Sequence, residues 1–190
     1  MHVLAISGSL RARSSNTELL TAAAMLAAPS VRVTSYDGLG GLPHFNPDLD
    51  DEGAVPPPAV RDLRAQVAGA DAIVISSPEY AHGVPGALKN ALDWLVSGSE
   101  IPGKPIGLLN ASARSTHAHA ALAETLRTMS TVLVPGACLT IPLDGRRPSA
   151  AEIVADPELA ALVRAALAAL TAAVRGRSTA GAPTDIEQRT

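Results

Sequence analysis

Short aliphatic runs alternate with longer segments of helical periodicity along most of this 190-residue chain. This alternation is typical of βαβ units, in which parallel strands are joined by crossover helices. The expected strands are residues 2–7, 31–36, 72–76, 105–111 and 132–141. Several of these runs are apolar throughout, as in strands that are buried on both faces. The sequence therefore predicts an α/β fold built on a parallel sheet.

Helix signals separate these strands. Ser15 and Glu18 have the spacing of a capping box, which predicts that the first helix begins near Asn16. Further helices are expected at about residues 56–70, 85–96 and 115–129. Pro135 and Gly136 interrupt the last expected strand, and they predict a bulge or bend there.

The C-terminal part of the chain ends in one more helix. Asp156 is its expected N-cap, Pro157 its first residue and Gly176 its stop. The segment 177–190 is polar and lacks periodicity, so it is expected to be a disordered tail. Residues 1–176 are expected to form one domain.

Composition narrows the class of partner. The formal net charge is −3 and no block of like charges occurs, which argues against general binding to nucleic acid. No apolar run reaches the length of a membrane span, so no membrane association is expected. Cys138 is the only cysteine, which excludes an intramolecular disulfide and fits a reducing cytoplasm. A small-molecule partner is expected instead.

The loop after the first strand has the chemistry of a phosphate site. In an open parallel sheet, ligands bind outside the carboxyl ends of the strands. Gly8 starts this loop, hydroxyls follow at Ser9, Ser15 and Thr17, and Arg11 adds a guanidinium. The N-terminus of the next helix favours an anion through its uncapped N–H groups and its dipole. The loop matches neither the Walker A pattern nor the dinucleotide fingerprint.

A second motif follows the third strand, as S-P-E-Y-A-H-G-V-P-G-A-L-K-N-A-L-D-W at Ser77 to Trp94. Together with G-S-L-R-x-x-S-x-N from Gly8, it resembles the NADPH-dependent FMN reductase family. The resemblance extends through L-P-H-F-N-P-D from Leu42 and fades beyond Asn110. It implies a flavodoxin-like three-layer α/β/α fold with a five-stranded sheet in the order 2-1-3-4-5.

The resemblance also implies an FMN site. By likeness to the family, the FMN phosphate is held by Ser9, Arg11, Ser15, Asn16 and Thr17. The flavin ring is expected to lie against Pro78, Glu79, Tyr80, Ala81, His82 and Gly83. Two prolines and two glycines fix the course of this loop, so that its N–H groups can stabilise charge on the reduced ring. The family often has Asn where this chain has Ala81, so a side-chain contact is lost there.

The loop after the fourth strand supplies weaker candidates. The family is often glycine-rich here, whereas this chain has Asn110 to Ser115 without a glycine. Ser112 and Arg114 are the candidate flavin contacts. Arg114 has two open interpretations: it contacts the ring or the phosphate of the incoming nicotinamide cofactor, or it is only a solvated charge.

The activity implied by the resemblance is that of an FMN-dependent NAD(P)H oxidoreductase. NADPH or NADH would deliver a hydride to flavin N5, and the reduced flavin would then reduce a second small molecule by two electrons. Flavins, quinones, azo compounds and metal oxyanions remain open as electron acceptors. The family further implies a homodimer, possibly a tetramer, with Trp94 partly exposed in the monomer and buried at the interface.

Two other functions remain open at this point. One is a flavodoxin-type FMN electron carrier that does not oxidise NAD(P)H, although such carriers are strongly acidic and rich in aromatic residues around the flavin. The other is a relative that has lost flavin and serves as an interaction or sensor protein, suggested by the unusual loop at residues 110–115.

No metal site is expected. His117 and His119 are two residues apart, so on a helix they point to different sides. The acidic loop at residues 48–52 lacks the glycine and the bidentate glutamate of a calcium loop, and it is interpreted as a solvated linker. Cys138 is interpreted as an inert core residue.

Overall fold

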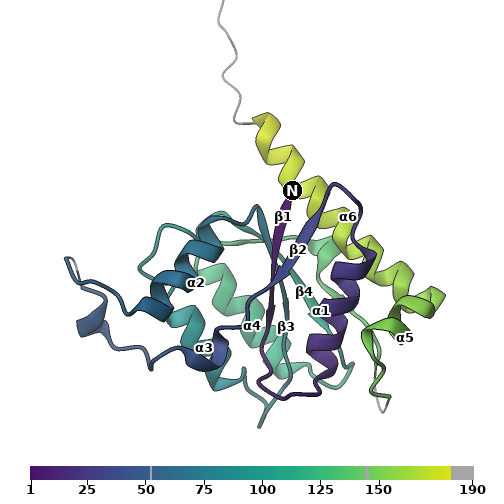
Figure 1. Ribbon diagram of the computed structural model, residues 1–190, viewed down its shortest axis with the longest axis horizontal. Helices are drawn as coiled ribbons and strands as arrows, with labels where there is room; N and C mark the ends of the chain where they lie inside the picture. Colours follow the sequence, from purple (N-terminus) through teal and green to yellow (C-terminus); the bar gives the residue numbers. More distant parts are fainter. Residues whose placement is uncertain (52, 144–145, 181–190) are drawn as a thin grey trace, which may run out of the picture.

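A parallel β-sheet forms the centre of the structure, a computed structural model that describes residues 1–51, 53–143 and 146–180 (Figure 1). The strands β1 to β4 are His2–Ser7, Arg32–Ser35, Ala72–Ser76 and Pro105–Asn110. The short strands β5 and β6 are Val132–Leu133 and Leu139–Thr140. The order is β2-β1-β3-β4-β5, and β6 also pairs with β4. The predicted flavodoxin-like fold and strand order are confirmed.

The expected fifth strand is divided, as its proline and glycine suggest. β5 pairs with the start of β4, and β6 pairs with Leu109 and Asn110 at its end. Between them Pro135–Ala137 forms a turn of 3-10 helix, η3. Because Pro135 has no N–H to donate to a ladder, the chain leaves the sheet here and rejoins it beyond Cys138.

Helices cover both faces of the sheet. On one face lie α1 (Ser15–Leu26), α5 (Ala150–Ala155) and α6 (Pro157–Ala180), at the right of Figure 1. On the other face lie α2 (Pro58–Ala68), α3 (Gly86–Asp93) and α4 (His117–Thr128), towards the left. Two further 3-10 turns, η1 (Leu39–Gly41) and η2 (Pro47–Leu49), belong to the long connection before α2. Val60, Leu63 and Val67 are fully buried on one face of α2, at the three- and four-residue spacing of an amphipathic helix.

Trp94 is not the half-exposed residue that the sequence suggested. Its side chain is fully buried within its own chain. The indole Nε1 donates to the carbonyl of Pro43 at 2.8 Å, and the ring of Phe45 packs edge-on at 5.0 Å. The segment before α2 folds back over α3 and covers Trp94, so this residue offers no surface to a second subunit.

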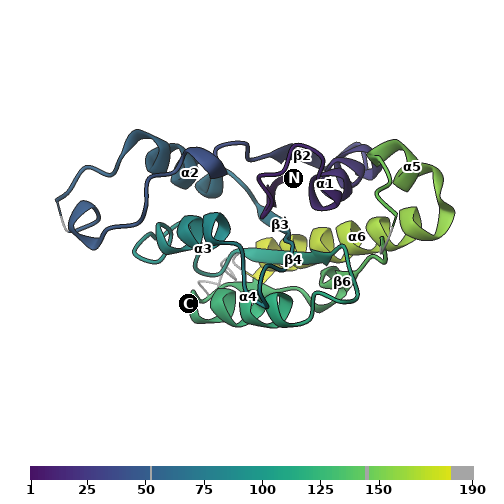
Figure 2. The same ribbon diagram turned by 90° about the horizontal axis from the view of Figure 1, so that it is seen from below.

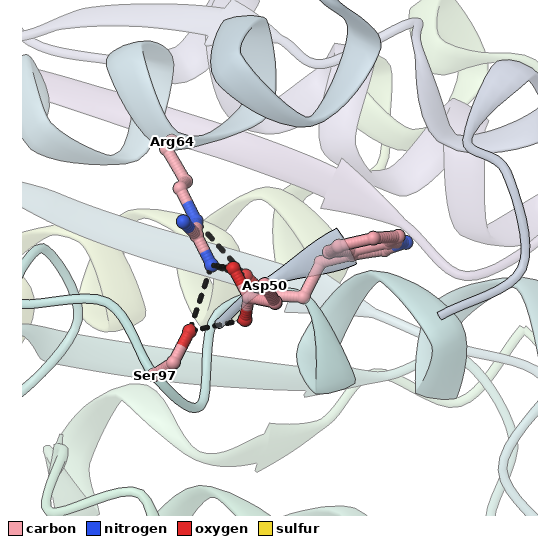
Figure 3. Close-up of polar contacts among 4 residues, drawn as sticks. Asp50, Arg64 and Ser97 are labelled. Atoms are coloured by element: carbon pink, nitrogen blue, oxygen red, sulfur yellow. Dashed lines mark hydrogen bonds and ion pairs between the residues drawn. The ribbon is translucent and has the colours of Figure 1, made fainter. Parts of the chain in front are cut away.

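Asp50 in the acidic loop is not the solvated residue that the sequence suggested. Asp50 and Arg64 form an ion pair of 2.7 Å, and their side chains are 6% and 16% exposed (Figure 3). The Arg64 guanidinium also donates to Ser97 Oγ, and Ser97 in turn donates to Asp50. This network anchors the segment before α2 to the end of α3.

The predicted capping box of α1 is wrong, although α1 begins at Ser15, close to the predicted Asn16. A capping box is formed instead by Ser149 and Glu152 at the start of α5, a helix that the sequence analysis missed. Glu18 does not cap its own helix, because its Oε2 accepts from the N–H of Ala150 at 2.7 Å. Asp156 caps α6 as predicted, since its Oδ1 accepts from the N–H groups of Glu158 and Leu159.

The last helix does not stop at Gly176 but continues to Ala180, so the first four residues of the expected tail are helical. Residues 181–190 lie outside the described part of the chain. Within the described residues, Pro157–Arg177 is long and apolar enough by length and composition to cross a membrane. One face of this helix is in the core through Leu159, Val163 and Leu170, and 33% of the apolar window is buried.

Candidate functional site

Three loops meet at the carboxyl end of the sheet, at the bottom of Figure 1; Figure 2 views the molecule from that side. They follow β1, β3 and β4, as the strand order requires. Between them lies a cavity of about 400 Å³, within the usual range for cofactor sites. Its lining includes Ser15, Asn16, Ser77, Pro78, Glu79, Ser112 and Arg114.

The loop after β1 approaches the loop after β3 very closely. The N–H of Gly8 donates to the carbonyl of Ser76 at 2.8 Å. A Cβ on Gly8 would lie 2.5 Å from Ser77 Oγ and 2.9 Å from Ser77 Cβ. Only glycine fits at this position, and its absent side chain lets the two loops form one wall of the cavity.

The N-terminus of α1 is open to this cavity. Ser14 is the N-cap residue, but its side chain makes no capping hydrogen bond. Side chains of the protein itself cap the N-termini of two other helices. Glu79 Oε2 accepts from the N–H of Ala118 at 2.9 Å in α4, and Ser149 with Glu152 caps α5. The first turn of α1 therefore keeps N–H groups and a positive dipole end for an anion.

A hydrogen bond from the end of β3 fixes the Asn16 side chain in this first turn. Its Oδ1 accepts a hydrogen bond of 2.8 Å from Ser76 Oγ at the end of β3. Both side chains are buried, with Asn16 8% exposed. Because Ser76 occupies the acceptor oxygen, the Asn16 amide group is left to donate towards the cavity that it lines.

The residues that follow Pro78 form a tight turn. Tyr80 and Gly83 exchange two backbone hydrogen bonds of 3.2 and 2.9 Å. Between them Ala81 and His82 have φ of 49° and 59°, both in the left-handed region. Positive φ at both central positions is typical of a type I′ turn, which usually carries Asn or Gly. The two backbone hydrogen bonds hold this strained turn in one conformation beside the cavity.

The loop after β4 is closed by Asn110. Its Nδ2 donates to the carbonyl of Ser115 at 3.2 Å, and its Oδ1 accepts from the N–H of Ser112 at 3.3 Å. Ser112 Oγ also accepts from the N–H of Arg114. Side-chain hydrogen bonds thus shape this loop in place of glycines.

The structure separates the predicted FMN residues into three groups. Ser15, Asn16, Pro78, Glu79, Ser112 and Arg114 line the cavity together. Ser9, Arg11 and Thr17 instead line a neighbouring hollow that reaches the end of β2. Tyr80, Ala81, His82 and Gly83 form the turn beside the cavity rather than its described lining. The loops are brought together as expected, but the phosphate residues do not all face one space.

Sequence reasoning missed Arg146 and Arg147, which also line the cavity, as does Leu143. They follow β6 at the same end of the sheet, so the strand-end rule could have found them. The end of β6 was difficult to locate from the sequence, because Pro135 interrupts the expected strand and β6 has only two residues.

The structure also places the candidate metal ligands, the histidines and the cysteine that the sequence analysis considered. Among the described residues, no three His, Cys, Asp or Glu side chains group as metal ligands. The rings of His82 and His117 stack at 4.3 Å, and burial lowers the pKa of His119. Burial raises the pKa of the Cys138 thiol, which keeps it protonated and unreactive at neutral pH.

Sequence comparison finds relatives for most of the chain. The sequence model of the NADPH-dependent FMN reductase family matches residues 1–145. An NAD(P)H-dependent FMN reductase of Pseudomonas aeruginosa is 42% identical over 113 residues, which cover 58% of this chain and 60% of that protein. A quinone reductase of Escherichia coli is 35% identical over 106 residues, 56% of this chain and 54% of that protein. The matched segments thus span little more than half the length of these curated relatives.

A solved structure extends the likeness over almost the whole fold. A flavoenzyme NAD(P)H:(acceptor) oxidoreductase of Paracoccus denitrificans superposes with a TM-score of 0.71 at 27% identity. The match covers 90% of this chain and 97% of that one.

Proposed function

Because this chain belongs to the NADPH-dependent FMN reductase family, we propose that it is an FMN-dependent NAD(P)H oxidoreductase. The observation that carries the proposal is the cavity that the loops after β1, β3 and β4 enclose at the open N-terminus of α1. It would offer FMN an anion site beside the loops after β3 and β4, which could contact the flavin ring. FMN, when bound, accepts a hydride from reduced pyridine nucleotide and passes two electrons to an acceptor.

The protein residues would bind and orient the cofactor. Ser15 and Asn16 would donate to its phosphate from the first turn of α1, with Arg11 and the hydroxyls of Ser9 and Thr17 nearby. Pro78, Glu79 and the turn at residues 80–83 would present backbone to the ring. Ser112 and Arg114 would close its other side.

The names of the relatives favour a small-molecule electron acceptor, with quinones the first class to test. Among the described residues that line the cavity, none is aromatic, which leaves room for a planar acceptor over the ring. We further propose a cytoplasmic location and a homodimer or tetramer, as the family implies. The buried Trp94 means that any such interface uses other residues of α3 or another surface.

The test is an anaerobic absorbance scan of purified, FMN-reconstituted protein before and after addition of NADPH or NADH. Bound flavin that bleaches with either nucleotide, and is reoxidised by a quinone, supports the proposal. Bound flavin that stays yellow with both nucleotides contradicts the oxidoreductase and favours an electron carrier. Protein that binds no FMN contradicts the cofactor assignment.

A further inference from the structure

A second, positively charged cavity adjoins the candidate flavin cavity. Its volume is about 340 Å³, and it lies between the loop after β1 and the segment that leads into α5. Its lining carries the guanidinium groups of Arg11, Arg13 and Arg147. Ser15 and Arg147 line both cavities, so the two spaces share a wall.

Glu18 and Glu152 also line this cavity, and each accepts its hydrogen bonds from groups at the start of α5 rather than from an arginine. Glu18 is engaged with the N–H of Ala150 at 2.7 Å. Glu152 accepts from the N–H and the hydroxyl of Ser149, both at 2.7 Å. In the described part of the chain, Arg11, Arg13 and Arg147 enter no ion pair. Against the two carboxylates the three guanidinium groups leave a formal excess of one positive charge, and their N–H donors are available to a ligand.

FMN alone does not account for all three guanidinium groups. Its single phosphate group would be held at the open first turn of α1 by Ser15 and Asn16, with Arg11 nearby. Arg13 lines only the second cavity of the two. Several guanidinium groups around one small space fit a phosphate dianion, because each presents a planar pair of donors to two oxygens.

We propose that Arg13 and Arg147 bind the 2′-phosphate of NADPH and make this protein select NADPH over NADH. The inference rests on the proposed function, since it assumes that a pyridine nucleotide reaches the flavin cavity. The two nucleotides differ only in that phosphate monoester, and arginine is the residue that commonly receives it. The shared wall at Arg147 lets a nucleotide extend from the first cavity into the second.

The test is calorimetric titration of FMN-loaded protein with adenosine 2′,5′-bisphosphate and with adenosine 5′-monophosphate. The unmodified protein should bind the bisphosphate about tenfold or more tightly, as expected for a charge-assisted phosphate contact. Arg13→Gln and Arg147→Gln should each lose about tenfold in bisphosphate affinity and keep their affinity for the monophosphate. Arg175→Gln, which removes an exposed charge from α6, is the matched control and should change neither.

Three results would overturn the inference. The first two are equal affinity of the unmodified protein for both probes, and inorganic phosphate that binds as tightly as the bisphosphate. The third is an Arg13→Gln variant that loses FMN affinity but still discriminates between the two nucleotides. The last would assign the guanidinium to FMN. Measuring flavin bleaching by NADPH and by NADH distinguishes a failure of this inference from a failure of the proposed function. Equal bleaching by NADPH and NADH contradicts only the selectivity, whereas no bleaching by either contradicts the oxidoreductase.

Discussion

Ser76 Oγ donates a buried hydrogen bond of 2.8 Å to Asn16 Oδ1, which joins the end of β3 to the first turn of α1. Asn16→Ala should therefore leave the Ser76 hydroxyl without its acceptor and lower the free energy of unfolding by about 1–3 kcal/mol. FMN affinity should fall as well, because the amide that lines the cavity is removed. Urea unfolding of the apoprotein and FMN fluorescence titration measure the two effects.

Two further variants control this prediction. Ser76→Ala combined with Asn16→Ala should cost less than the sum of the single variants, since the double variant leaves no orphaned hydroxyl. Thr21→Ala, on the exposed side of α1, should change stability by about 0.5 kcal/mol or less. Additive losses from the two buried sites would mean that this hydrogen bond does not couple them.

Gly8 should tolerate no side chain. Gly8→Ala places a Cβ 2.5 Å from Ser77 Oγ, so the loops after β1 and β3 must separate. The expected loss is about 1–3 kcal/mol of unfolding free energy, with weaker FMN binding, as for other overpacked sites. Gly41→Ala is the matched control, because no atom lies within 4 Å of its added Cβ. Similar stability losses in both variants would contradict the close approach.

The left-handed turn at Ala81 stores strain that substitution can release. Ala81→Gly should stabilise the protein by about 0.5–1 kcal/mol, since glycine adopts the observed φ of 49° without a Cβ penalty. Ala81→Val should destabilise it, because a β-branched residue is disfavoured there. Thermal unfolding of the apoproteins orders the three variants. If Ala81→Gly is the least stable, the turn does not have this conformation in solution.

Tyr36 should make the protein sensitive to alkali. Its hydroxyl is buried and has no hydrogen-bond partner among the described residues, and burial, with a contribution from Asp62, raises its pKa to about 12. A folded-state pKa above the unfolded value of about 10 contributes stability below pH 10, and this contribution is lost between about pH 10 and 12. Urea unfolding at pH 7 and pH 10.5 should show that loss.

The Tyr36→Phe variant should remove this pH-dependent contribution. It should also be more stable at pH 7, by about 1 kcal/mol or more, because an unpartnered buried hydroxyl is eliminated. An equal alkaline loss in the variant and the unmodified protein would assign the effect to another group.

The sequence determined the fold because its patterns are local. Period and length distinguish buried strands such as Ala72–Ser76 from the helices between them, and parallel strands then bring their carboxyl ends together. The two motifs also predicted loops that line the candidate cavity, since the residues of each loop are contiguous in the chain. Asp156 was found as a helix cap for the same reason: its partners are two and three residues away.

Only the tertiary structure decided which side chains meet across the chain. Glu18 had the spacing of a local cap but pairs with Ala150, and Asp50 looked solvated but pairs with Arg64. Trp94 is covered by a segment distant in sequence, and Arg147, more than 130 residues beyond the loop after β1, lines a cavity together with that loop. Such pairings depend on how helices and loops pack around the sheet, because a polar group takes whichever partner geometry brings within reach, and no local pattern encodes that choice.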